Sequence, residues 1–166
     1  MEFRIPIAES YAILLGRAAY NLAYLEWCIF WTAERISAPF IAEAQERTSG
    51  RNATAFRGVI TASNIAEPLR STLLGFADRF AEATKRRDAL LHGHPFTATN
   101  GEQRLAYRGR HPDEEWTEAR ITETALEFEA LAIDINNTFH SELAAQLITS
   151  TYAPTNEHRL GGMPLP

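Results

Sequence analysis

Cysteine is almost absent from this sequence, with Cys28 alone among 166 residues. A lone thiol closes no internal disulfide and supplies no cysteine metal cluster, which excludes small disulfide-stabilised scaffolds and predicts a cytoplasmic protein. A long apolar run is also missing, because Glu26 interrupts the most apolar stretch, residues 22–33, and a bilayer span needs ~20 residues. The opening MEFRIPIAES has no basic flank or cleavage site, so neither a secretory signal nor a membrane partner is expected.

Positive charge is scarce as well. The formal net charge is −5, and Lys85 is the one lysine beside 15 arginines. A negative molecule repels nucleic acid, so DNA is not an expected partner and any RNA contact must be local. The sequence holds no glycine-rich phosphate loop and no nucleophile elbow, which leaves nucleotide-dependent phosphoryl transfer and acyl transfer without support.

What the sequence does contain is typical of one soluble domain, with 45% hydrophobic and 22% charged residues. We expect this domain to span residues 1–152. Residues 153–166 hold three prolines and two glycines and are predicted to form a C-terminal tail.

Apolar residues at three- and four-residue spacing predict three long helices. The first covers residues 11–37 with Ser10 as its N-cap, and Pro39 ends it. The segment 40–63 is mixed, with a loop around 48–52 and one or two short helices. The second long helix follows Pro68 and places Arg87 on its apolar seam before Gly93 ends it.

A β-hairpin is predicted next, because the runs 96–99 and 103–108 flank Asn100-Gly101. The capping box that starts at Thr124 then predicts a third long helix that ends near residue 150. The expected fold is therefore all-α, an antiparallel helical bundle with a small β-hairpin inserted before the last long helix.

The most reactive stretch is RRDALLHGHPF, residues 86–96, at the predicted end of the second long helix. Asp88 and His92 lie about 40° apart on the helix, so the carboxylate is placed to orient the imidazole. Arg87 and His92 are about 140° apart, and they converge on one ligand only if the helix ends there. Arginine offers a fixed fork to phosphate and histidine exchanges protons near neutrality, the two tasks of phosphodiester cleavage.

The run from Arg87 to His92 resembles the RxxxxH motif of the HEPN superfamily of all-α domains. The resemblance implies a metal-independent endoribonuclease of toxin or phage-defence type, without a cofactor, that acts on RNA as a homodimer with two motifs in one composite site and is restrained by an antitoxin protein. His92 is then the general acid or base, Arg87 stabilises the charge on the phosphate, and Asp88 is the orienting polar residue. The cationic neighbours that we expect to contact RNA are Lys85, Arg86 and His94.

Other interpretations of the same residues stay open. One HEPN branch carries a modifiable tyrosine two positions after the histidine, but this sequence has His94 there, so control by tyrosine modification is not expected. The domain is alternatively a catalytically inactive HEPN-like binding or regulatory module. Arg87 is alternatively a snorkelling or ion-paired side chain, and His92 a helix-end histidine favoured by the dipole. A metal site made of Asp88, His92 and His94 is a further alternative.

Three other patterns invite a functional interpretation. Glu26 is expected to be an exposed helix residue rather than part of the cluster. An aromatic stripe at helical spacing is expected to pack in the core or in a dimer, with base stacking as the alternative; it consists of Tyr20, Tyr24, Trp27 and Trp31. A cationic group on and after the hairpin either guides RNA or keeps an edge strand solvated; it consists of Arg104, Arg108, Arg110 and His111.

Overall fold

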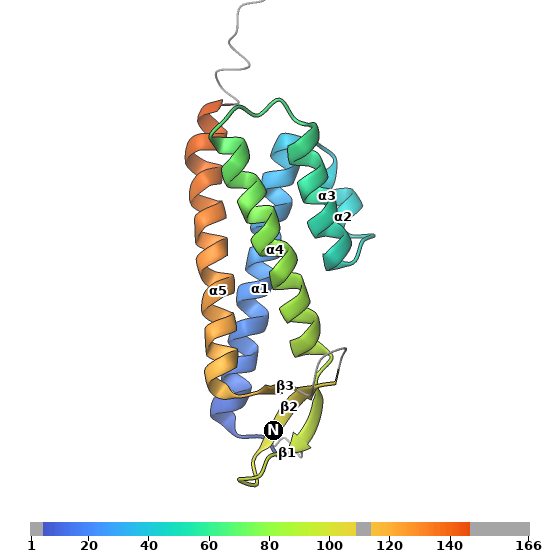
Figure 1. The fold of residues 1–166 in the computed structure, drawn as a ribbon, viewed down its shortest axis with the longest axis vertical. Coiled ribbons are helices and arrows are strands. Elements are labelled where there is room, and N and C mark those ends of the chain that lie inside the picture. The colour runs from blue at the N-terminus through green and yellow to red at the C-terminus, as the bar shows by residue number, and fades with distance from the viewer. Residues whose placement is uncertain (1–4, 109–113, 147–166) are drawn as a thin grey trace, which may run out of the picture.

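The computed structural model describes residues 5–108 and 114–146, and shows a mostly helical molecule with a small antiparallel sheet at one end (Figure 1). The helices are α1 (Glu9–Ile36), α2 (Phe40–Ala44), α3 (Ser49–Ala62), α4 (Leu69–Leu91) and α5 (Glu118–Thr138), and a π-helical segment η1 (Phe139–Leu143) extends α5. The strands are β1 (His94–Thr97), β2 (Gln103–Tyr107) and β3 (Glu114–Trp116). No helix in the described ranges has the length and apolarity of a membrane span.

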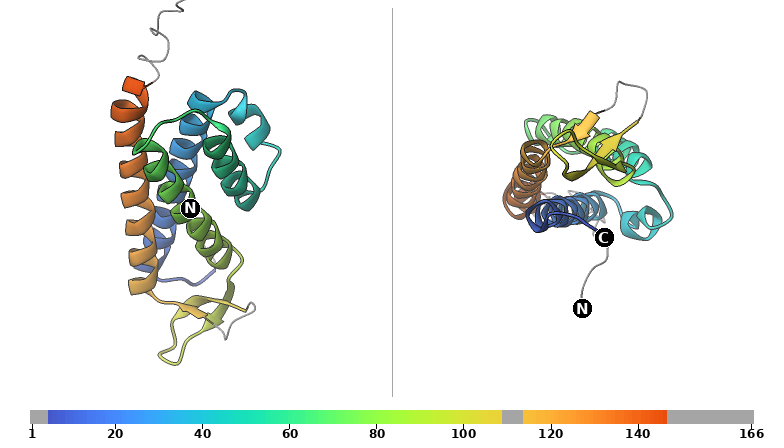
Figure 2. Two further views of the ribbon diagram at one scale, coloured as in Figure 1. Left: turned by 45° about the horizontal axis from the view of Figure 1, so that its top comes forward. Right: turned by 90° about the horizontal axis from the view of Figure 1, so that it is seen from below.

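The three long helices, α1, α4 and α5, alternate in direction along the chain (Figure 1), and the first and the last of them lie side by side. Ser10 at the start of α1 donates to Glu118 at the start of α5, and further along Asn21 donates to the Ala125 carbonyl. The two long helices therefore run side by side in the same direction. Helix α4 runs against both of them (Figure 2) and returns the chain to the end where α1 starts, and the sheet connects α4 to α5 at that end.

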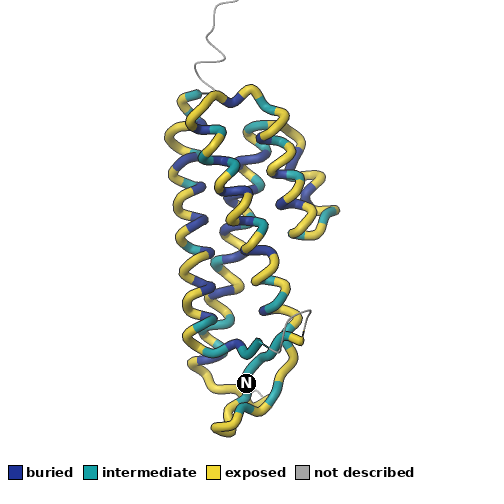
Figure 3. Tube along the Cα trace, viewed as in Figure 1, coloured by how far each residue is buried: buried dark blue, intermediate teal, exposed yellow. Residues whose placement is uncertain are grey.

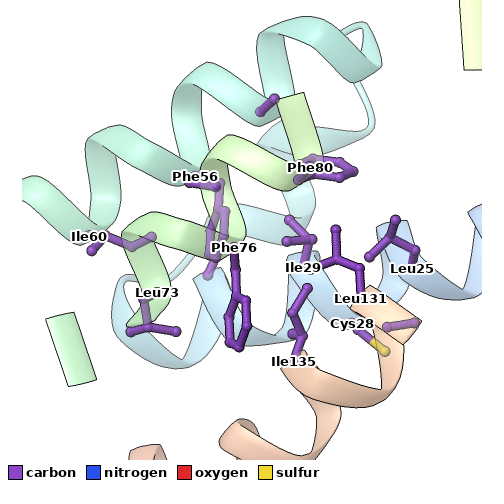
Figure 4. Packing of buried hydrophobic residues seen from close by; sticks show 14 of the residues in the cluster. Leu25, Cys28, Ile29, Phe56, Ile60, Leu73, Phe76, Phe80, Leu131 and Ile135 are labelled. Atoms are coloured by element: carbon purple, nitrogen blue, oxygen red, sulfur yellow. The ribbon is translucent and has the colours of Figure 1, made fainter. Parts of the chain in front are cut away.

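The core consists of two clusters, and buried positions line the inward faces of the helices (Figure 3). The larger cluster joins the upper halves of α1, α3, α4 and α5, where Ile29, Phe56, Phe80 and Leu131 point toward one another (Figure 4). This packing confirms the apolar seams predicted for the long helices, since their spacing follows the helical repeat. The smaller cluster joins α1 and α5 to the sheet and includes Tyr11, Leu90, Trp116 and Ile121.

The sheet has three strands rather than the two of the predicted hairpin. Strands β1 and β2 form that hairpin, and Gly101 adopts the positive φ of 85° that its turn requires. Strand β3 then pairs with β2, with Trp116 opposite Leu105. Strand β3 has the sequence Glu114-Glu115-Trp116, which is too short and too polar to be predicted as a strand. The fully buried Trp116 side chain fixes its position.

Two helix starts differ from the predicted ones. Helix α5 begins at Glu118 with Thr117 as its N-cap, so Thr124, expected to start the helix, is a buried interior residue. Residues 49–52 begin α3 instead of forming a loop, because the Thr48 hydroxyl accepts from the Arg51 N–H. Small polar residues are typical of both helix caps and loops, which is why the start of α3 was predicted to be a loop. The predicted tail, residues 153–166, lies outside the described residues, as does the predicted end of the last helix near 150.

Candidate functional site

The candidate motif lies on the last turn of α4, where the sheet fixes the helix end. The helix's final carbonyls are hydrogen-bonded: that of Asp88 accepts from the His92 N–H at 3.0 Å, and that of Ala89 accepts from the indole N–H of Trp116 at 3.2 Å. Gly93 lets β2 approach closely, because a Cβ there would lie 3.2 Å from the Leu105 Cβ. The helix therefore ends at a defined place, but its regular hydrogen bonding continues to His92, so Arg87 and His92 stay about 140° apart around the helix axis.

Arg87 sits on the apolar seam but does not form an ion pair across the core. Its Nη1 donates to the carboxylate of its neighbour Asp88 at 2.9 Å, and its Nε is enclosed without a hydrogen-bond partner. The side chain keeps 31% of its surface exposed. The guanidinium thus reaches solvent, and in the described part of the chain its one hydrogen-bonding partner is the adjacent residue.

His92 is the C-cap of α4 and is exposed, with φ −100° and ψ 11°. Its imidazole makes no hydrogen bond to any described residue. Asp88, expected to orient this ring, pairs with Arg87 instead. The structure therefore brings Arg87 and His92 to one helix end without a direct hydrogen bond between them, and His94 follows, exposed, as the first residue of β1.

The expected RNA-contacting cations of α4 are exposed but already paired. Lys85 lies 2.6 Å from Glu82 on the same helix, and Arg86 forms an ion pair with Glu127 on α5. Both pairs are solvated, and exposed pairs of this kind contribute little to stability. Their cations remain available to a phosphate at little energetic cost.

A metal site and a deep pocket find no support at this end of α4. No group of three potential ligands among His, Cys, Asp and Glu occurs within residues 5–108 and 114–146. Four hollows in the described surface are lined by other parts of the chain, two of them by α1 together with α5, and one of these two also by η1. The candidate site is an open helix end.

The cationic group of the hairpin is partly neutralised. Arg104 bonds Glu102 at 2.6 Å and Glu115 at 2.5 Å, and these hydrogen bonds lower the pKa of the Glu102 carboxyl and raise that of the guanidinium. Arg104 is therefore part of the sheet, which favours a structural role. Arg110 and His111 lie outside the described residues.

Glu26 is remote from the α4 end and accepts a hydrogen bond of 2.5 Å from the Ser49 hydroxyl at the start of α3. The aromatic stripe is not in the core: Tyr20, Tyr24, Trp27 and Trp31 are all at least 45% exposed. The expectation of interior packing is wrong within one chain, and packing in a dimer stays a prediction.

Sequence reasoning missed the residues that support the motif. Tyr11 on α1 donates to the Trp116 carbonyl at 2.7 Å and accepts from the Leu105 N–H at 3.0 Å, so its phenol connects the first helix, β2 and β3. Trp116 in turn holds the last turn of α4. One signal in the sequence could have indicated this support: Trp116 is a single large aromatic residue in an otherwise polar stretch.

No family model, no curated protein and no solved structure matches this chain.

Proposed function

We propose that the protein is a metal-independent endoribonuclease that acts at the end of α4 through Arg87 and His92. The observation that carries this proposal is that both side chains reach solvent at one helix end while the fold makes little use of either. Arg87 bonds only its neighbour among the described residues, and the His92 imidazole has no hydrogen bond there. Such placement favours a ligand-directed role over the alternative of a core ion pair.

The chemistry follows from the two side chains. The Arg87 fork binds the scissile phosphate and stabilises the charge that develops on its oxygens. His92 accepts the proton of the ribose 2′-hydroxyl, whose oxygen bonds to phosphorus as the bond to the 5′-oxygen breaks. The 5′-oxygen takes a proton from water, which leaves a 2′,3′-cyclic phosphate and a 5′-hydroxyl, and His92 later releases its proton to solvent. In this assignment Asp88 positions the guanidinium, and Lys85, Arg86 and His94 contact neighbouring phosphates.

A cytoplasmic RNase of this kind needs restraint, and an antitoxin protein is the partner that the proposal implies. The competing function is a helical binding or regulatory module without catalysis. One observation favours it: the α4 end is open and none of the four hollows described above includes Arg87 or His92. Cleavage of RNA by the purified protein distinguishes the ribonuclease from the binding module.

The test is cleavage of single-stranded RNA oligonucleotides and total RNA in EDTA, with identification of the termini. His92→Ala is expected to lower the cleavage rate by at least about 100-fold, the usual contribution of a general acid or base. Arg87→Ala is expected to lower it by about 100- to 1000-fold, and Arg87→Lys to restore only part of the rate because the fork is lost.

Arg79→Ala is the matched control, since Arg79 is an exposed α4 arginine that pairs with Asp134 at 2.8 Å, well before the helix end. It should leave the rate unchanged. Cleavage that persists in His92→Ala, or that needs a divalent ion, would contradict the mechanism. A wild-type protein that cleaves none of these RNAs would contradict the ribonuclease and leave the binding module as the competing function.

A further inference from the structure

Exposed large hydrophobic side chains gather on one face of the molecule. Ten such residues occur in the described ranges, and seven of them project from α1 and α5. We call this set the aromatic face: Ile13, Tyr20, Tyr24, Trp27, Trp31, Leu126 and Ile133. The other three are Ile5 and Ile7, which precede α1, and Leu91, at the end of α4.

The α1 part of the aromatic face points away from the core. At about 100° per residue, its α1 members lie on the side of the helix opposite buried Leu25 and Ile29. Two hollows connect α1 with α5 along it, one of about 340 Å³ beside Trp31 and Phe139, and one of about 530 Å³ beside Tyr20 and Ile133. The perpendicular rings of Trp27 and Trp31, 5.7 Å apart, form one wall of the smaller hollow.

The aromatic face is large enough to form the apolar centre of a subunit interface. Its four aromatic side chains are 45–71% exposed, and at ~200 Å² each they present about 400 Å² to water before the aliphatic members are added. The α1 members alone span about 27 Å of helix. A stable interface covers about 800 Å² per partner, of which the four aromatic side chains supply about half. Their area alone equals the largest apolar patch of a typical monomer, about 300–600 Å², which is often a functional surface.

We propose that the aromatic face binds a second copy of this chain across a two-fold axis near Tyr24. Arg17 and Trp31 lie seven residues on either side of Tyr24, so this axis sets Arg17 of each copy against Trp31 of the other. Arg17 is exposed, lines the larger hollow and has no hydrogen bond or ion pair with any described residue. A guanidinium over an indole ring is a favourable contact, and the symmetry forms it twice.

The charges along the aromatic face fit a copy of the chain better than RNA. Binding of single strands to stacked aromatics requires a row of cations along the phosphates. Here the larger hollow has one arginine, Arg17, balanced by Glu129, and the guanidinium of Arg35 already covers the Phe139 ring at 5.0 Å. A mixed, nearly neutral rim around an apolar centre is typical of protein interfaces.

This inference does not rest on the proposed ribonuclease, and it has a consequence for that site. Helix α4 packs on the inner side of the α1 and α5 pair (Figure 2, right), whereas the aromatic face is on the outer side. A dimer through the aromatic face therefore leaves the two α4 ends on the outside of the assembly. Each candidate site stands alone in it, unlike the composite site that the HEPN resemblance implies.

The test is the mass of the full chain in solution by light scattering and sedimentation, from about 1 µM to about 1 mM. The wild type should approach twice the 18.6 kDa of one chain. The double substitution Tyr24→Glu with Trp27→Glu should weaken dimerisation by at least about 100-fold, because it places charges at the centre of both apolar faces. Ile7→Glu with Leu91→Glu is the matched control, which changes two exposed apolar residues elsewhere and should leave the dimer intact.

Tryptophan emission tests the same contact without any substitution. Of the three tryptophans, Trp116 is buried in the monomer, so a red shift on dilution reports Trp27 and Trp31 alone. A wild type that stays monomeric, or a dimer that survives the double substitution, would overturn the proposal. Quenching of a monomer's emission by single-stranded RNA, lost in the double variant, would overturn it in favour of a base-stacking surface. Loss of RNA cleavage alone would not affect it.

Discussion

At the scale of single residues, Tyr11 does the most to fix the candidate site. Its phenol is buried and bonded to the Trp116 carbonyl and the Leu105 N–H. Tyr11→Phe removes both bonds and leaves two enclosed backbone groups unpaired, which should lower the free energy of unfolding by about 1–3 kcal/mol. Urea unfolding measures the change. Tyr107→Phe is the control, because the Tyr107 hydroxyl has no hydrogen bond to a described residue, and it should have an effect within about 0.5 kcal/mol.

The same residue predicts a pH dependence. Burial raises the pKa of Tyr11 above the ordinary 10.0, and the Leu105 N–H and the Arg104 charge oppose that rise. Because the folded pKa is the higher one, the stability from the neutral phenol is fully present below pH 10 and is lost as the pH rises through the folded pKa. The stability gap between wild type and Tyr11→Phe should therefore narrow above pH 10. A difference in unfolding free energy between wild type and Tyr11→Phe that grows above pH 10 would contradict the role of the neutral phenol.

Residues of the motif were easier to predict than the residues that support it. Arg87 and His92 stand out because guanidinium and imidazole at this spacing are chemically distinctive. Tyr11 looked like one more apolar position of a stripe, and its role depends on a strand 105 residues away. Asp88 shows the limit of helix geometry: it was placed to reach His92, but Arg87 is adjacent and carries a permanent charge, so the carboxylate pairs there.

At the scale of elements, the N-terminus of α5 offers a clean test. The Thr117 hydroxyl accepts from the Arg120 N–H at 3.2 Å and caps the helix. Thr117→Ala should lower the free energy of unfolding by about 1 kcal/mol, because an orphan N–H loses its partner. Thr122→Ala is the matched control, since this exposed hydroxyl only bonds back to the Glu118 carbonyl within the same helix. Equal losses in thermal or urea unfolding would show that the cap contributes nothing special.

Long helices were predictable and short elements were not, for a physical reason. Helices α1 and α4 bury a whole stripe of their own residues, so their sequences carry the period of that burial. Strand β3 depends on one buried residue, Trp116, and helix α2 on two, Phe40 and Ala44, and these residues pack against other elements of the chain. Such contacts leave no periodic trace in a three- or five-residue segment.

At the scale of the whole molecule, the least predictable feature is which helical face stays uncovered. Spacings of three and four indicate that Tyr20, Tyr24, Trp27 and Trp31 share a face, but equally regular spacing marks Leu22, Leu25 and Ile29 on the opposite side. Helix α1 has apolar stripes on both sides, and only the packing of α4 and α5 decides between them. The direct contact between α1 and α5 was equally hidden, because helical periodicity shows which side of each helix is apolar but not which helices meet.

The dimer and the candidate site together make one more prediction, on catalysis by mixed assemblies. If each α4 end works alone, dimers that exchange subunits between wild type and His92→Ala lose activity in proportion to the mutant fraction, to about one half in an equal mixture. A composite site that needs both imidazoles falls instead with the square of the wild-type fraction, to about one quarter. The control carries His92→Ala together with Tyr24→Glu and Trp27→Glu, cannot join a dimer, and should leave wild-type activity unchanged. A loss of activity that follows the square of the wild-type fraction would mean that two α4 ends form one site. The dimer would then need an interface other than the aromatic face.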